Sequence, residues 1–179
     1  MILASGSPQR RAILEQLGIE FRVEVPGTEE LAEGDPPEIV TENARRKTRA
    51  IVARERVLGV DTAVVLDTRI FGKPRGAEEA ASFLATLSGR MHEVMSGIVL
   101  REPDGTELSH VAVTRVRMRA LERADLDWYL ATGEWAERAG GYAIQGKGAA
   151  LIEGIEGDYT NVVGLPVAAL LGLAPDLIR

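Results

Sequence analysis

Residues 1–11 read Met-Ile-Leu-Ala-Ser-Gly-Ser-Pro-Gln-Arg-Arg. The apolar run at residues 2–4 predicts a short buried strand, and the small residues at 5–7 predict a turn. Pro8 suits the first position of a helix, because proline lacks an N–H that would have no partner there, and Ser7 is a favoured N-cap. The stretch therefore predicts a strand, a tight turn and then a helix.

The start of this helix is a candidate phosphate site. A helix N-terminus presents free N–H groups and a partial positive charge, which attract anions. Ser5, Ser7, Arg10 and Arg11 add two hydroxyls and two guanidiniums within seven residues. The same residues also fit an ordinary strand–turn–helix connection with a serine cap and two solvated arginines, and both interpretations stay open at this point.

Composition narrows the class of protein. The 179 residues fit one domain, which we expect to span residues 1–179, and 45% hydrophobic with 27% charged residues is typical of a soluble globular protein. The absence of cysteine excludes disulfides, thiolate metal sites and thiol nucleophiles. With only two histidines a multi-histidine metal site is not expected, and we expect His92 to face a sheet without a catalytic role.

Charge and hydropathy indicate the partners. The net charge of −6 argues against binding to nucleic acid and favours a small anionic ligand at local basic sites. No apolar stretch is long enough to cross a bilayer and no signal-sequence pattern is present, so we expect a cytoplasmic protein without a membrane partner. Many small α/β enzymes are two-fold dimers, and a homodimer is one expectation here.

Helical and strand patterns alternate along the chain, which predicts an α/β fold with a mixed, twisted central sheet flanked by helices. Helices are expected at about 8–17, 38–54, 78–87, 122–131 and 167–173, and strands at 2–4, 20–25, 57–60, 63–66, 69–71, 92–100, 107–119 and 149–155. In the strand at 107–119 the apolar positions change phase, which predicts a bulge near Thr114–Arg115.

Asp61 and Thr62 follow the apolar run at 57–60, so we expect Asp61 at the carboxyl end of a core strand. Ligands of open α/β sheets bind outside such strand ends. An aspartate there can hold a divalent cation or accept a proton from water. The alternative is a helix cap or a turn.

Four further residues are candidates, each with a structural alternative. Lys73, between a glycine and a proline, could meet a phosphate or lie in water at a hairpin end. Lys47 belongs to a basic run that a helix normally displays to solvent. Glu30 could join Asp61 at a metal or keep a loop soluble. The Gln145 amide could meet a base edge, or its neighbouring glycines could form a bulged strand entry. Together, cations, acids and a helix N-terminus are what cleavage of a nucleoside polyphosphate needs.

Six motifs occur in the order found in a known family: SGSPQRR (5–11), GVDT (59–62), GKP (72–74), LSGRMH (87–92), AGGYAIQG (139–146) and GDYTNVVGLP (157–166). Over residues 2–173 the chain resembles the Maf family, septum-formation inhibitors that act as nucleoside triphosphate pyrophosphatases. The resemblance implies a fold related to Ham1 and inosine triphosphatases, with the nucleotide in a cleft between two lobes. It also implies hydrolysis of a nucleoside triphosphate to the monophosphate and pyrophosphate with Mg²⁺ or Mn²⁺.

The resemblance assigns roles residue by residue. Asp61 would accept a proton from the attacking water, and Glu30 would be an acid near the metal, so these two residues are the metal candidates. The residues that would grip or contact the nucleotide are Ser5, Ser7, Gln9, Arg10, Lys47 and Lys73. Thr62 and Gln145 would help to choose the base, as in the branch that prefers dTTP and UTP.

Gln9 departs from that branch, which usually carries arginine at this position, and Met91 replaces a common threonine. The branch that acts on 7-methyl-GTP has tryptophan where this chain has Gln9. The expected substrates are dTTP, UTP or related pyrimidine nucleotides, including modified ones that a house-cleaning enzyme would remove. The alternative from another class is a non-catalytic nucleotide sensor that affects cell division.

Overall fold

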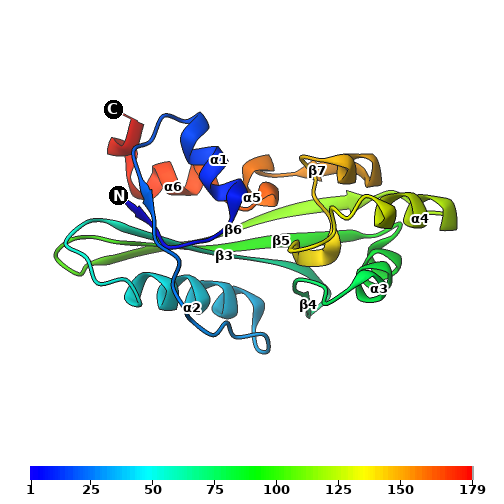
Figure 1. Cartoon of the computed structure of the whole chain (residues 1–179), viewed down its shortest axis with the longest axis horizontal. Helices are drawn as coiled ribbons and strands as arrows, with labels where there is room; N and C mark the ends of the chain where they lie inside the picture. Colours follow the sequence, from blue (N-terminus) through cyan, green and yellow to red (C-terminus); the bar gives the residue numbers. More distant parts are fainter. Residues whose placement is uncertain (179) are drawn as a thin grey trace.

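The structure is a computed structural model and describes residues 1–178. Its centre is a mixed seven-stranded sheet in the order β2-β1-β3-β5-β6-β7, with β4 pairing with β3 (Figure 1). The strands are β1 (Ile2–Leu3), β2 (Arg22–Val23), β3 (Val57–Leu66), β4 (Arg69–Phe71), β5 (Met91–Arg101), β6 (Glu107–Met118) and β7 (Ile152–Glu156). β1 is parallel to β2 and β3, and the other pairs are antiparallel. The predicted mixed α/β fold is confirmed.

Helices cover both faces of the sheet. They are α1 (Pro8–Gln16), α2 (Pro36–Arg49), α3 (Ala77–Leu87), α4 (Arg123–Ala131), α5 (Tyr159–Val163) and α6 (Val167–Leu173), with 3₁₀ turns η1 (Ala139–Gly141), η2 (Lys147–Leu151) and η3 (Pro175–Ile178). In Figure 1, α2 lies below the sheet, and α1, α5 and α6 lie above it. α3 and α4 pack at the other end, where Phe83 and Tyr129 join the largest apolar cluster. In the described chain no helix is long and apolar enough to span a bilayer.

Two glycines let α2 approach the sheet closely. A Cβ atom at Gly59 would collide with the carbonyl oxygen of Ala44, and one at Gly97 would collide with that of Val40. Because β3 and β5 carry no side chain at these two points, the backbone of α2 rests directly on the sheet. The side chains on this face of α2 therefore reach β3.

One sequence prediction about β3 is wrong. The strand expected at 57–60 and the hairpin arm expected at 63–66 form one continuous strand, and Asp61 lies in its middle rather than at its carboxyl end. Asp61 pairs in register with Gly97 of β5. A carboxylate is tolerated inside this strand because the ammonium group of Lys47 and the amide of Asn43, both on α2, bind it.

The predicted bulge near Thr114–Arg115 is also wrong. β5 and β6 pair without a break from Met91↔Arg117 to Arg101↔Glu107, and the irregular register lies between Arg117 and Met118 where β6 meets β7. The change of apolar phase has another cause, because other elements cover the two faces of β6 at different points, and Val113 on the same face as Val111 is 46% exposed. Val111 packs with the apolar cluster that includes Val40 of α2, whereas Val116 belongs to the cluster at the other end of the sheet.

Candidate active site

A gap in one edge of the sheet opens into a cleft. On this edge β3 pairs with β1 at residues 57–58 and with β4 from residue 64 onward. The stretch between these pairings carries Asp61 and Thr62 and faces a cleft of about 900 Å³. The sequence-predicted site residues all line this cleft: Ser5, Ser7, Gln9, Arg10, Glu30, Lys47, Asp61, Thr62, Lys73 and Gln145. The structure thus brings them together, and their roles remain predictions.

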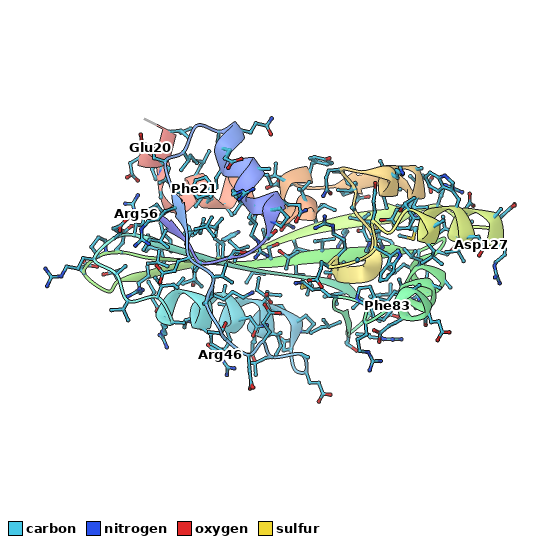
Figure 2. The ribbon with its side chains drawn as sticks, in the orientation of Figure 1. Glu20, Phe21, Arg46, Arg56, Phe83 and Asp127 are labelled. Atoms are coloured by element: carbon cyan, nitrogen blue, oxygen red, sulfur yellow. The ribbon has the colours of Figure 1, made fainter. Side chains whose placement is uncertain are left out.

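On the α2 side of β3, one ammonium group joins two carboxylates. Nζ of Lys47 lies 2.6 Å from Oδ1 of Asp61 and 2.7 Å from Oε1 of Glu30. Lys47 is buried, whereas the adjacent Arg46 points away from the sheet (Figure 2). The basic run of α2 therefore displays charge to solvent, as one interpretation expected, but Lys47 is the exception because its position on the helix faces β3.

Asp61 is held at both carboxylate oxygens. Lys47 binds Oδ1, and Nδ2 of Asn43 donates to Oδ2 at 3.0 Å. Asn43 and Lys47 are four residues apart on α2, so they lie on the same face of the helix one turn apart. This arrangement fixes the Asp61 carboxylate at the wall of the cleft.

Glu30 stays ionised in this setting. Partial burial alone would raise the pKa of Glu30, but the charge and hydrogen bond of Lys47, with help from Lys73 and Arg10, outweigh it and leave the pKa below its usual value. The net shift indicates that the cations around the cleft favour negative charge at this point.

On the opposite face of β3, Arg10 is buried among neutral oxygens. Its Nη2 donates to Oγ1 of Thr62 at 3.1 Å, its Nη1 to Oγ of Ser5 at 2.9 Å, and its Nε to the carbonyl of Gly164 at 2.8 Å. Burial lowers the pKa of Arg10, an effect that the more distant charges of Asp61 and Glu30 oppose. Arg10 is 8% exposed, and within residues 1–178 no carboxylate forms an ion pair with it. A buried guanidinium in this state can receive an anion from the cleft.

Helix α1 starts at Pro8 as predicted, but the side chain of its N-cap residue does not cap the helix. Ser7 occupies the N-cap position before Pro8 and makes no side-chain cap hydrogen bond. Its hydroxyl instead donates to Oε1 of Gln9 at 3.1 Å, and its N–H donates to Oγ of Ser5 at 3.2 Å. Because no side chain caps this helix, the helix start keeps its capacity for an anion at the cleft.

Lys73 and Gln145 also line the cleft. The Lys73 side chain is 60% exposed and pairs at 2.9 Å with Glu137, whose side chain is 80% exposed. A hydrogen bond from the N–H of Gly140 to the carbonyl of Gly72 joins these two segments. Gln145 and Gln9 also line a second groove of about 490 Å³ that shares this rim. Polar amides therefore mark the border between the charged cleft and a neighbouring groove.

The donor set of the cleft fits a hard divalent cation bound together with a ligand. In residues 1–178 no group of three or more acidic or histidine side chains gathers as a metal site. Glu30 and Asp61, however, already surround a single cation, the ammonium of Lys47. Mg²⁺ is commonly held by one or two carboxylates, with phosphate oxygens and water completing its shell.

Sequence reasoning missed two residues of the site. Asn43 is 3% exposed and follows Ile39 by four positions, so a polar residue on the buried face of an amphipathic helix was the available signal. Glu137 carried no signal, because its contact with Lys73 joins segments far apart in the chain.

His92 is buried against Tyr142, with 2.8 Å between Nε2 and the phenol oxygen, and burial lowers the pKa of His92 to about 4.

The fold and the cleft define an α/β protein with a charge-lined site for an anionic ligand. The chain belongs to the Maf family, since the family model described as "Maf-like protein" matches residues 1–176. It is 47% identical to a dTTP/UTP pyrophosphatase of Anaeromyxobacter sp. (strain Fw109-5), covering 94% of this chain and 84% of the relative. It is 44% identical to a dTTP/UTP pyrophosphatase of Thermus thermophilus, covering 97% of this chain and 92% of the relative.

Solved structures include more distant similarities. The Ham1 protein of Staphylococcus aureus is 15% identical, with a TM-score of 0.48 over 65% of this chain and 70% of that protein. A nucleoside-triphosphatase, dITP/XTP pyrophosphatase, of Mycobacterium abscessus is 19% identical, with a TM-score of 0.45 over 67% of this chain and 74% of that protein.

Proposed function

We propose that this protein hydrolyses nucleoside triphosphates to the nucleoside monophosphate and pyrophosphate, acting on dTTP, UTP or related pyrimidine nucleotides. The observation that carries the proposal is the buried, carboxylate-free guanidinium of Arg10 in the same cleft as the Asp61–Lys47–Glu30 group. The side of the cleft with Arg10 suits binding of an anion, and the side with Asp61, Lys47 and Glu30 suits acid–base chemistry. The names of the relatives, dTTP/UTP pyrophosphatases, support the reaction and the substrate class.

The triphosphate would bind between the start of α1 and the two lysines. Arg10 keeps N–H donors for phosphate oxygens in addition to the three that it uses within the protein. Lys47 and Lys73 also line the cleft and would add point charges. These cations stabilise the negative charge that develops on pyrophosphate as it leaves.

Asp61 would accept a proton from the water that attacks the α-phosphorus. The new bond joins the water oxygen to the α-phosphorus, and the bond to the β-phosphate oxygen breaks to release pyrophosphate. Lys47 and Asn43 hold the carboxylate of Asp61 in one orientation for this transfer. Glu30 and Asp61 would hold Mg²⁺ or Mn²⁺, which when bound neutralises charge on the phosphate oxygens.

Selection of the base would fall to residues at the inner end and rim of the cleft. Gln9 and Gln145 can each donate to and accept from a base edge. The Thr62 hydroxyl is tied to Arg10 and Ser96, so it is held beside the anion site. We propose that these contacts favour a pyrimidine.

The test is release of pyrophosphate from a panel of nucleotides with Mg²⁺ or Mn²⁺. The panel contains dTTP, UTP, the purine triphosphates and modified pyrimidine triphosphates. We expect pyrophosphate and monophosphate in equal amounts, with the highest kcat/KM for a pyrimidine. Binding of nucleotide without release of pyrophosphate from any member of the panel would instead identify a non-catalytic regulator.

A further inference from the structure

Asn43 of α2 connects the middle of β3 to the segment that carries Glu30. We propose that Asn43 is a positioning residue, which fixes Asp61 and the segment around Glu30 relative to each other. This inference rests on the proposed function for its catalytic consequence, and its structural part can be tested independently.

The Asn43 amide makes three hydrogen bonds to groups far away in the sequence. Oδ1 accepts from the N–H of Leu31 at 2.7 Å, and Nδ2 donates to the carbonyl of Leu31 at 3.0 Å. Nδ2 also donates to Oδ2 of Asp61 at 3.0 Å. Both N–H groups and the carbonyl of the side chain are therefore used, and the side chain is buried.

These partners allow only one orientation of the amide. A flipped Asn43 would place its oxygen against the carboxylate of Asp61 and the carbonyl of Leu31, and its NH₂ against the N–H of Leu31. Each of these contacts would be repulsive, and buried polar groups without partners are costly. Asn43 thus presents an N–H donor to Asp61 as a consequence of its bonds to Leu31.

The segment at residues 25–34 depends on this side chain. It contains no helix or strand, and among residues 1–178 its backbone hydrogen bonds run to the Asn43 side chain alone. The Glu30–Lys47 ion pair is its other polar attachment. Glu30 is adjacent to Leu31, so the bonds at Leu31 also restrict where the Glu30 carboxylate can lie.

Asn43 and Lys47 differ in how they respond to a phosphate. The ammonium of Lys47 would be attracted to a bound triphosphate as well as to its carboxylate partners. The neutral amide of Asn43 has no such competing attraction. Asn43 can therefore hold Asp61 and the segment around Glu30 without being drawn toward the substrate.

The test compares Asn43→Leu, which keeps the size but removes the hydrogen bonds, with the control Thr48→Val. Thr48 is also buried on α2 and bonds only within that helix, to the carbonyl of Arg45. Two properties are measured for each protein: kcat and KM for the best nucleotide, and the rate of cutting by a glutamate-specific protease after Glu29, Glu30 and Glu33.

For Asn43→Leu we expect kcat to fall about 10- to 100-fold, as for loss of a hydrogen bond to a charged group, with a smaller change in KM. We expect the segment to be cut at least several-fold faster. Thr48→Val should leave both properties near the wild-type values. Asn43→Gln, which keeps the amide on a longer stem, should recover part of the protection and part of kcat.

Wild-type kcat in Asn43→Leu, or a lower kcat without faster cutting, would overturn the proposal that Asn43 positions Asp61 and the segment around Glu30 relative to each other. An unchanged cutting rate would overturn the structural part whatever the activity. If wild-type protein hydrolyses no nucleotide, the proposed function fails. The cutting rates alone then support or overturn the proposal that Asn43 holds the segment at residues 25–34. If Asn43→Leu does not fold by circular dichroism, Asn43→Ala replaces it with the same expected results.

Discussion

Two successive residues of β3 meet buried cations on opposite faces of the sheet, and the two cations are compensated differently. On one face Asp61 and Glu30 surround Lys47, so that the ammonium has two carboxylate partners. On the other face Thr62, Ser5 and a backbone carbonyl surround Arg10, so that the guanidinium has neutral partners only among residues 1–178.

The difference separates two functions within one cleft. A buried charge is costly unless it is paired or well hydrogen-bonded, and removing one partner of a buried pair leaves the other uncompensated. Lys47 is therefore part of the internal structure of the acidic group. Arg10 retains attraction for an anion from outside, and we expect binding of phosphate to depend more on Arg10 than on Lys47.

The largest expected effect is that of Asp61→Asn. Loss of the proton acceptor should lower kcat about 10²- to 10⁴-fold, because general-base assistance contributes on this scale. The fold should be retained, since Lys47 keeps its ion pair with Glu30. The measurement is pyrophosphate release at saturating nucleotide, with circular dichroism and thermal unfolding as controls. Near-normal turnover would exclude Asp61 as the base.

Replacement of each cation by methionine tests the comparison directly. Arg10→Met should weaken nucleotide binding about 10- to 100-fold, since charge-assisted hydrogen bonds to phosphate are lost, and should cost less stability than Lys47→Met, because the acceptors it leaves without a donor are neutral. Lys47→Met should lower the midpoint of thermal unfolding more than Arg10→Met does, because two carboxylates lose their common partner. Binding is measured by calorimetry with a non-hydrolysable triphosphate.

The opposite ranking of the two unfolding midpoints would contradict the proposal that Arg10 serves phosphate binding and Lys47 the structure of the acidic group. Unchanged nucleotide binding in Arg10→Met would contradict it as well. A suitable control is Arg11→Met, because Arg11 is an exposed neighbour on α1 whose ion pair among residues 1–178 is with Glu15. This control should leave both binding and stability near the wild-type values.

The sequence predicted the local structure around Arg10 well. Strand, turn and helix at residues 2–16 follow from adjacent residues, whose preferences for a strand, a turn or a helix start act over a few positions. What sequence spacing could not show is that the cation opposite Asp61 is Lys47, fourteen positions away in another element.

The wrong predictions for β3 and β6 also arise from contacts with elements that are distant in the sequence. Asp61 interrupts an apolar run, so a strand end was the simplest interpretation, yet contacts from α2 satisfy its charge and the strand continues. The buried faces of β6 were inferred from one strand alone, although other elements cover one face near Val111 and the opposite face near Val116. Such tertiary compensation depends on the close approach of α2 that Gly59 and Gly97 permit.

A smaller effect is expected at the rim of the cleft. Glu137→Gln removes the carboxylate that pairs with Lys73, so Lys73 becomes more available to the triphosphate. We expect KM to fall by up to about 5-fold at low salt, because an exposed ion pair is worth about 0–1 kcal/mol. The difference should diminish at high salt as charges are screened. A KM that rises in Glu137→Gln would mean that Glu137 itself contacts the substrate.

The smallest expected effect concerns the choice of base at Gln9. Oε1 of Gln9 already accepts from the Ser7 hydroxyl, so its NH₂ is the group left to meet a base. Gln9→Arg keeps N–H donors there, and these suit the carbonyl oxygens of uracil and thymine. We expect kcat/KM for UTP and dTTP to rise about 2- to 5-fold relative to ATP and GTP, the scale of one neutral hydrogen bond. An equal change for all four nucleotides would mean that the added charge acts on the phosphates, and an unchanged ranking would show that position 9 does not select the base.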